Sequence, residues 1–288
     1  MFPVTHRRCG KAQPLISLLV GCLLLAVSNT SVAQGGNYRI LLSNDDGIGS
    51  PLLHALHKEL AVLPGVEVLV SAPNENKSGS SQSSNAAIDV EPYYSDGEFF
   101  GYAVHGAPAD SVRFAVVKFG RDTEFDLVVS GINRGANVGN VSHLSGTVGA
   151  AMEGIYHGIP AIAISQDVEG VDTTASAKFA AQLVQRYQRT GAPKGTVISI
   201  NIPRGELRGV AVRPMGDSYL STASYQATAT QGELTSYKRE RAIIQSTDDS
   251  TDTYAYQQGY ISVTPLKFDW TDFEMLDELQ SWNLQLAD

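Results

Sequence analysis

Two adjacent carboxylates follow an apolar run near the start of this chain. Residues 38–43 read Tyr-Arg-Ile-Leu-Leu-Ser, and Asn44-Asp45-Asp46-Gly47 comes directly after them. Two carboxylates about 4 Å apart repel by roughly 4 kcal/mol at an effective dielectric constant near 20, unless one is protonated or a cation lies between them. A hard divalent cation with oxygen ligands would remove this repulsion. An ordinary turn is the competing interpretation, because all these residue types favour turns.

Three further polar segments lie next to predicted strand ends or helix starts. Residues 74–83 follow a predicted strand and supply hydroxyls, amides and the ammonium of Lys77. Residues 130–139 leave a strand that we expect to end at Val129, and their glycines permit the close backbone approach that phosphate loops need. Ser145-Gly146-Thr147 opens a predicted helix, whose free N–H groups favour an anion. Each segment alone is also compatible with a plain loop or an ordinary helix N-cap. What favours a functional site is that all of them are expected at the ends of strands of the same sheet.

Strands and helices alternate along most of the chain. The apolar patterns predict strands at 38–43, 66–72, 125–130, 161–165 and 197–202, and helices from 51, at 110–118, at 147–156 and around 179–187. Right-handed crossovers between such strands favour a parallel sheet, and ligands bind at the carboxyl ends of its strands. We therefore predict an α/β fold with a Rossmann-like, mostly parallel sheet flanked by helices.

The C-terminal third has a different composition. Residues 216–260 are rich in Ser, Thr, Gln and Tyr, which predicts β-hairpins or an extended arm that packs on another subunit or over the site. Residues 272–283 follow as an expected amphipathic helix. We expect residues 34–288 to form a single domain, with 216–260 as an oligomerisation arm.

The first 33 residues predict export. They contain a basic stretch, an apolar stretch and Ser31-Val32-Ala33, the arrangement of a cleavable signal peptide, which indicates a periplasmic or secreted protein. A membrane anchor would need about 20 apolar residues, more than this run contains. Acylation at Cys22 is a minor alternative. No later run is long enough to cross a membrane, so we expect no membrane association after cleavage.

Removal of the leader would leave a chain without cysteine and with a large negative net charge. The leader holds Cys9 and Cys22, so the mature chain would have no cysteine for thiol chemistry. Loss of the three basic residues of the leader leaves 18 Lys and Arg against 30 Asp and Glu, a net charge of −12. A chain this acidic is a poor partner for polymeric nucleic acid. An anionic substrate would therefore need local attraction from a metal, helix N-termini or a few basic side chains.

Five motifs follow one another in a fixed order along the chain: Ile40 to Gly47, Ser78-Gly79, Gly106-Ala107-Pro108-Ala109-Asp110-Ser111-Val112, Ser130-Gly131-Ile132-Asn133 and 145–154. Together they resemble the survival protein SurE family of metal-dependent nucleotidases, and residues 259–266 are similar to a late strand of that family. The resemblance implies a phosphomonoesterase that hydrolyses nucleoside 5′- and 3′-monophosphates, with one divalent cation, Mg²⁺ or Mn²⁺, in each subunit. It also implies a homodimer or homotetramer. The metal ligands of the family fall on Asp45, Asp46, Ser78 and Asn133.

The resemblance leads to one mechanistic hypothesis. Asp46, beside Asp45, would be the general base for the attacking water, although direct attack by a carboxylate is a competing route. The phosphate would be bound by Asn133, Ser145, Gly146, Thr147 and Lys77, the last at a position where the family often has Arg.

Two other functions compete with this hypothesis. A Rossmann dehydrogenase is disfavoured, because the first predicted strand leads to Asn-Asp-Asp-Gly and not to Gly-x-Gly-x-x-Gly. The non-enzymatic alternative is an exported nucleotide- or phosphate-binding protein without turnover, which would keep the anion-binding loops.

Overall fold

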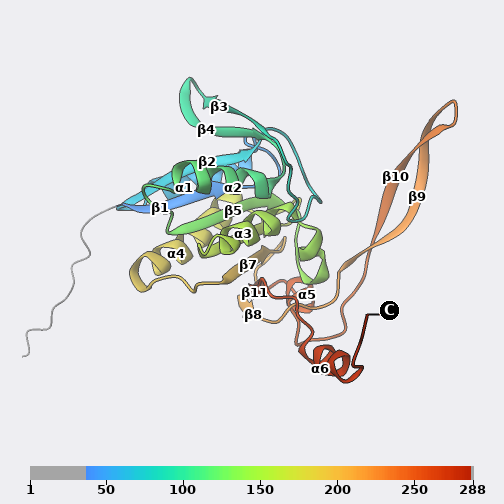
Figure 1. Ribbon diagram of the computed structural model, residues 1–288. Helices are drawn as coiled ribbons and strands as arrows, with labels where there is room; N and C mark the ends of the chain where they lie inside the picture. Colours follow the sequence, from blue (N-terminus) through green and yellow to red (C-terminus); the bar gives the residue numbers. More distant parts are fainter. Residues whose placement is uncertain (1–36, 287–288) are drawn as a thin grey trace, which may run out of the picture. The chain divides into compact units, whose positions relative to one another are not determined.

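The computed structural model describes residues 37–286, whose main sheet has nine strands (Figure 1). They are β1 (Tyr38–Ser43), β2 (Val66–Pro73), β3 (Asp89–Ser95), β4 (Glu98–His105), β5 (Leu127–Arg134), β6 (Ala161–Gln166), β7 (Thr196–Ile202), β8 (Val210–Val212) and β11 (Ile261–Lys267). Their spatial order is β3-β4-β2-β1-β5-β6-β7-β11-β8. All neighbours pair in parallel except β3 with β4 and β11 with β7. The prediction of a mostly parallel sheet is confirmed.

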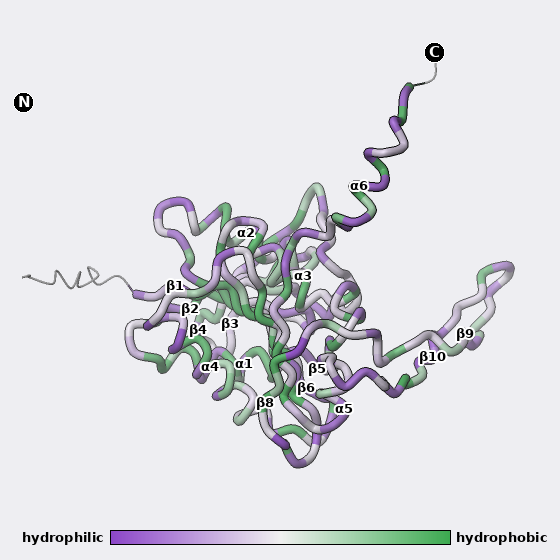
Figure 2. The backbone as a smooth tube through the Cα atoms, turned by 90° about the horizontal axis from the view of Figure 1, so that it is seen from below, coloured by the Kyte–Doolittle hydropathy of each residue, from purple (hydrophilic) through white to green (hydrophobic). Residues whose placement is uncertain are grey.

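Two helices cover each face of this sheet. The helix α1 (Pro51–Ala61) packs with α4 (Thr173–Thr190), and α2 (Pro108–Phe119) packs with α3 (Gly146–Tyr156). Alternate side chains of β1 point to the two faces: Ile40 and Leu42 join the core under α1 and α4, and Leu41 joins the core under α2 and α3. Figure 2 shows the apolar segments gathered along the strands. Burial on both faces explains why the strands read as continuous apolar runs.

The strand that carries Asn133 is longer than predicted. The prediction that it ends by residue 130 is wrong, because main-chain pairing with β6 resumes at Asn133 opposite Ser165 after an irregularity that begins at Ser130. Asn133 is therefore held at the end of a strand. The short 3-10 helix η1 (Gly139–Leu144) then leads into α3. The hairpin of β3 and β4 was also absent from the sequence-based prediction.

The predicted hairpin is present, and it is shorter than residues 216–260. The strands β9 (Leu220–Gln231) and β10 (Leu234–Ile243) pair only with each other among the described strands, and most of their side chains are exposed (Figure 1). The helix α5 (Asp252–Gln257) belongs to the body instead, because the buried Asp252 carboxylate accepts hydrogen bonds from the N–H groups of Gly139 (3.1 Å) and Gly216 (2.8 Å). The arm is thus confined to the hairpin.

The last helix forms as predicted, as α6 (Phe273–Ser281), and none of its residues is buried. Within residues 37–286, no helix combines the length and the apolar composition needed to cross a lipid bilayer. The predicted signal peptide, residues 1–33, lies outside the described residues. Export therefore stays a prediction.

Candidate active site

The loops after β1 and β2 are joined by main-chain contacts. The Lys77 N–H donates to the main-chain oxygen of Asp45 (2.7 Å), and the Asn44 side chain closes the turn by donating to the Gly47 carbonyl (2.9 Å). Gly47 has a φ of +99°, and a Cβ there would lie 3.0 Å from the Glu75 carbonyl carbon. Glycine is required by both the positive φ and the close approach. The two loops therefore meet at the carboxyl edge of the sheet, where the carboxylates lie.

Asp45 is buried against the first turn of α3. Its side chain accepts a hydrogen bond from Thr147 Oγ1 (2.5 Å), and a Cβ on Gly146 would lie 3.0 Å from Asp45 Oδ2. Burial raises the pKa of Asp45 from 3.8 to about 6; the Thr147 hydrogen bond opposes this rise and the Asp46 charge adds to it. A buried carboxyl group with a raised pKa is typical of a functional site.

Asp46 joins the loop after β2 to the end of β5. Asn76 Nδ2 donates to its Oδ1 (3.0 Å), and the Arg134 main-chain N–H donates to its Oδ2 (2.9 Å). The group is half-buried, and burial raises its pKa against the opposing effect of the Arg134 hydrogen bond. Asn76 and the Arg134 N–H are partners that the sequence-based prediction missed. The signal for Asn76 was its place two residues before Ser78.

Asn133 and Ser78 supply the other predicted metal ligands. The Asn133 amide nitrogen donates to the Gly135 carbonyl (2.6 Å), so the side-chain oxygen takes no part in this hydrogen bond. Ser78 is exposed, and its N–H donates to Asn76 Oδ1 (3.0 Å), so Asn76 links the Ser78 loop to Asp46. The structure therefore brings the loops of all four predicted ligands to one edge of the sheet.

The groups at this edge fit a hard cation. In the described residues, no three His, Cys, Asp or Glu side chains form a metal-binding group, so two carboxylates would act with amide and hydroxyl oxygens. Ser80 Oγ is buried without a hydrogen-bond partner in the described structure, and it lies 2.8 Å from a Cβ built on Gly146. Oxygen donors of this kind suit Mg²⁺ or Mn²⁺ rather than a softer metal.

The predicted phosphate ligands divide into two groups. Ser145 caps α3 by accepting the Val148 N–H (3.1 Å), so the N–H groups of Gly146 and Thr147 lie in the first turn without intrahelical acceptors. The Thr147 hydroxyl is already engaged by Asp45. The Lys77 ammonium pairs with Glu75 (2.6 Å) and not with Asp45 or Asp46. The helix start is therefore the better-placed anion site.

Comparison with known proteins identifies the family. The family model described as "Survival protein SurE" matches residues 40–222. The chain belongs to this family. It is 36% identical over 252 residues to a protein named 5′-nucleotidase SurE from Syntrophobacter fumaroxidans, covering 85% of this chain and 100% of that relative. A 5′-nucleotidase SurE from Symbiobacterium thermophilum is 36% identical over 254 residues, covering 85% and 98%. The crystal structure of a SurE protein from Aquifex aeolicus matches with a TM-score of 0.71 at 31% identity, covering 85% of this chain and 100% of that one.

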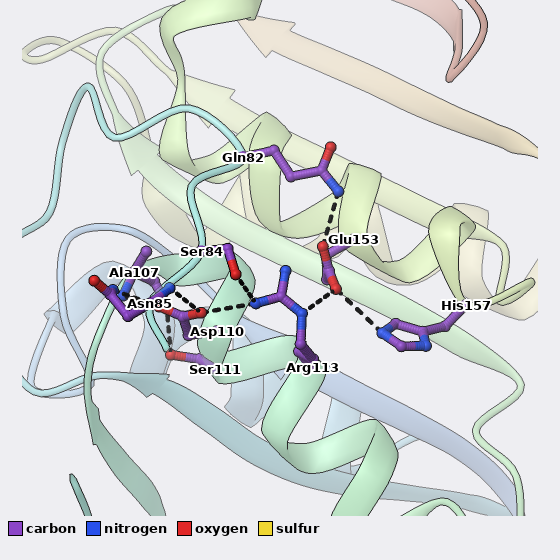
Figure 3. A network of polar contacts seen from close by, with 9 residues as sticks. All are labelled: Gln82, Ser84, Asn85, Ala107, Asp110, Ser111, Arg113, Glu153 and His157. Carbon is purple, nitrogen blue, oxygen red and sulfur yellow. Dashed lines mark hydrogen bonds and ion pairs between the residues drawn. The ribbon is translucent and has the colours of Figure 1, made fainter. Parts of the chain in front are cut away.

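A buried polar network supports the site in this SurE-family chain (Figure 3). Arg113 donates to Glu153 Oε1 and Asp110 Oδ1, each at 2.8 Å, and both carboxylates are almost fully buried. Gln82 Nε2 donates to Glu153 Oε2 (2.8 Å) and Asn85 Nδ2 donates to Asp110 Oδ2 (2.7 Å). The network therefore ties the chain that follows Ser78 to α2 and α3. Apart from Asp110 and Arg113, which lie three residues apart on α2, its partners are too far apart in the sequence to be predicted from spacing.

The raised pKa of Asp45 predicts how the stability of the metal-free SurE protein depends on pH. Because the folded pKa lies above the unfolded one, Asp45 contributes stability below about pH 4 that is lost as the pH rises through about 6. Two pKa units correspond to about 3 kcal/mol. Asp45→Asn, which keeps an acceptor for Thr147, should therefore unfold at higher urea concentration than the wild type at pH 7 and at the same concentration at pH 4.

Urea unfolding in EDTA at pH 4, 5, 6 and 7 measures this difference. Asp96→Asn is the matched control, because Asp96 is exposed in the β3–β4 turn at a φ of 51°, which asparagine tolerates. Wild-type and Asp45→Asn profiles that run parallel from pH 4 to 7 would show that burial does not penalise the Asp45 charge.

Proposed function

We propose that this chain is a divalent-metal-dependent phosphomonoesterase that hydrolyses nucleoside 5′- and 3′-monophosphates to nucleoside and phosphate. The observation that carries the proposal is the burial of Asp45 beside Asp46 and directly against the first turn of α3. This arrangement places a cation site next to an anion site, which is what a metal-bound phosphate ester requires. The names of the two relatives, both 5′-nucleotidases, agree with this chemistry.

One Mg²⁺ or Mn²⁺ per subunit would be held by Asp45, Asp46, Ser78 and Asn133. When bound, the ion supplies Lewis-acid polarisation of a phosphate oxygen and lowers the pKa of a bound water. The amide nitrogen of Asn133 is already engaged by Gly135, so Asn133 would contribute its oxygen. The hydrogen bonds from Thr147 and Asn76 orient the two carboxylates before any ligand arrives.

The side chains and main chain of the protein would perform the remaining steps. The Gly146 N–H would bind a phosphate oxygen and stabilise the charge that it carries in the transition state, while Thr147, whose hydroxyl and main-chain N–H both face Asp45, would hold that carboxylate beside the phosphate. Asp46 would take the proton of the attacking water on its carboxylate, which the Arg134 N–H and Asn76 hold in place. Asp45, being less exposed, would act mainly on the cation.

Phosphate release from a panel of nucleoside 5′- and 3′-monophosphates tests the proposal. Release is expected with Mg²⁺ or Mn²⁺, should stop in EDTA, and should return when excess metal is added. Inorganic phosphate or AMP that binds to the metal-loaded protein with no release would instead favour an exported binding protein.

The β9–β10 hairpin is proposed to be the contact between subunits of a homodimer or homotetramer. Its exposed side chains include Tyr225 (63% exposed), Leu234 (71%) and Tyr237 (62%), which a second subunit would cover. Sedimentation equilibrium of the protein with and without residues 221–242 measures the mass of the assembly, which the deletion should lower. An unchanged mass after the deletion would contradict the role of the hairpin.

The chain is also proposed to be exported to the periplasm or beyond, with cleavage after Ala33. Scavenging of phosphate or nucleosides outside the cytoplasm would suit such a phosphatase. N-terminal sequencing of the protein recovered from cells and medium tests this: a mature chain starting at Gln34 is expected, and one starting at Met1 would contradict cleavage.

A further inference from the structure

A cavity of about 520 Å³ lies beside the first half of α3. Its lining includes Ser145, the chain neighbour of Gly146, which lies against Asp45, and Ser81, the chain neighbour of Ser80, which lies against Gly146. Consecutive Cα atoms are about 3.8 Å apart, so the cavity begins close to the start of α3. One sugar attached to a phosphate bound at the start of α3 would be long enough to reach it. The volume falls within the range of about 300–1,000 Å³ usual for small-molecule sites.

The walls of the cavity suit a flat, largely apolar ring. They include Val148, Met152 and Leu266, and methionine thioethers adapt to planar ligands. Trp270 also lines the cavity, and it meets the ring of His143 edge to face at 5.4 Å. Trp270 remains 76% exposed, so its ring has surface left for stacking. Aromatic side chains stack on nucleic acid bases of every kind, because every base has a π face.

One polar side chain in the cavity has a fixed orientation. Gln82 lines the cavity, and its Nε2 donates to Glu153 Oε2 at 2.8 Å. The Glu153 carboxylate also accepts a hydrogen bond from Arg113 at 2.8 Å, so it presents only acceptors to Gln82. If the Gln82 amide were flipped, its Oε1 would face Glu153 Oε2, and two acceptors would oppose each other. Figure 3 shows the Gln82 oxygen pointing away from Glu153. Gln82 is therefore held as a hydrogen-bond acceptor.

We propose that this cavity binds the base of the nucleotide, and that Gln82 selects bases with an exocyclic amine, such as adenine, over oxo bases such as hypoxanthine. The inference rests on the proposed nucleotidase function and adds the base preference to it. An amine would donate to Gln82 Oε1. An oxo group would face that oxygen with a second acceptor, and both groups would lose their hydrogen bonds to water.

The kcat/KM values of the full chain with Mn²⁺ for AMP, IMP and ribose 5-phosphate test the inference. AMP and IMP differ at the exocyclic position, and ribose 5-phosphate has no base. The wild type is expected to prefer AMP over IMP about tenfold, the effect of one hydrogen bond of about 1.4 kcal/mol. Gln82→Met removes the acceptor and should bring the AMP to IMP ratio to about one.

A control and a second variant make the outcome decisive. Gln188→Met is the matched control, because Gln188 lies on α4 and donates to the Pro64 carbonyl, away from the cavity lining. Trp270→Ala should raise the KM for AMP relative to that for ribose 5-phosphate, and this result does not depend on whether Gln82→Met folds. The control should keep the wild-type ratios.

The possible failures can be told apart. Hydrolysis of all three compounds with equal wild-type efficiency for AMP and IMP would overturn the base preference and leave the phosphatase function standing. An AMP to IMP ratio that survives Gln82→Met would also overturn the role of Gln82. No hydrolysis of any of the three compounds would defeat the proposed function itself.

Discussion

Replacing Asp46 by asparagine is expected to lower kcat for a nucleoside monophosphate by about 10²–10⁴-fold, the usual effect of losing a general base. Both oxygens of Asp46 accept hydrogen bonds, from Asn76 and from the Arg134 N–H. An asparagine has one acceptor oxygen, so it can satisfy only one of these donors, and it no longer takes a proton from water. The variant also loses one of the two negative charges proposed to hold the cation.

Steady-state kinetics at saturating Mn²⁺ measure this effect. Asp96→Asn makes the same substitution at an exposed carboxylate, and it should keep the wild-type kcat. The fold of Asp46→Asn should persist, because Asp46 is only half-buried, and circular dichroism would show it. Hydrolysis by Asp46→Asn at the wild-type rate would refute the assignment of Asp46 as the base.

Arg113→Met is expected to lower the free energy of unfolding by about 3–5 kcal/mol, since breaking a buried ion pair strands its partners. The partners are Asp110, which is 2% exposed, and Glu153, which is 1% exposed. The Arg113 side chain is itself 31% exposed, so a loss toward the lower end of this range is expected. Methionine keeps the apolar contacts of the arginine stem and removes only the charged donors.

Urea unfolding at pH 7 measures the loss. Arg189→Met, an exposed arginine in the last turn of α4, should change the stability little. Adding Glu153→Gln to Arg113→Met removes one stranded charge, so the double variant should be more stable than Arg113→Met alone. If Arg113→Met unfolds at the wild-type urea concentration, the two carboxylates are solvated and the network does not contribute to stability.

Local patterns in the sequence accounted for much of the fold. The strands β1 and β7 were predicted to within one residue at each end, because a strand buried on both faces reads as an unbroken apolar run. The hairpin of β3 and β4 was missed, because its exposed side chains interrupt that pattern. The predicted arm included α5, because the polar side chain of Asp252 gives no local sign that it is buried.

The sequence by itself determined which loops meet at the proposed site, because polar residues directly after buried strands come together at one edge of a parallel sheet. It could not show that Thr147 donates to Asp45, that Asn76 and the Arg134 N–H hold Asp46, or that Lys77 turns to Glu75. Only the tertiary structure decided these partners, because each hydrogen bond depends on the relative placement of elements far apart in the chain, and local residue patterns carry no information about that placement.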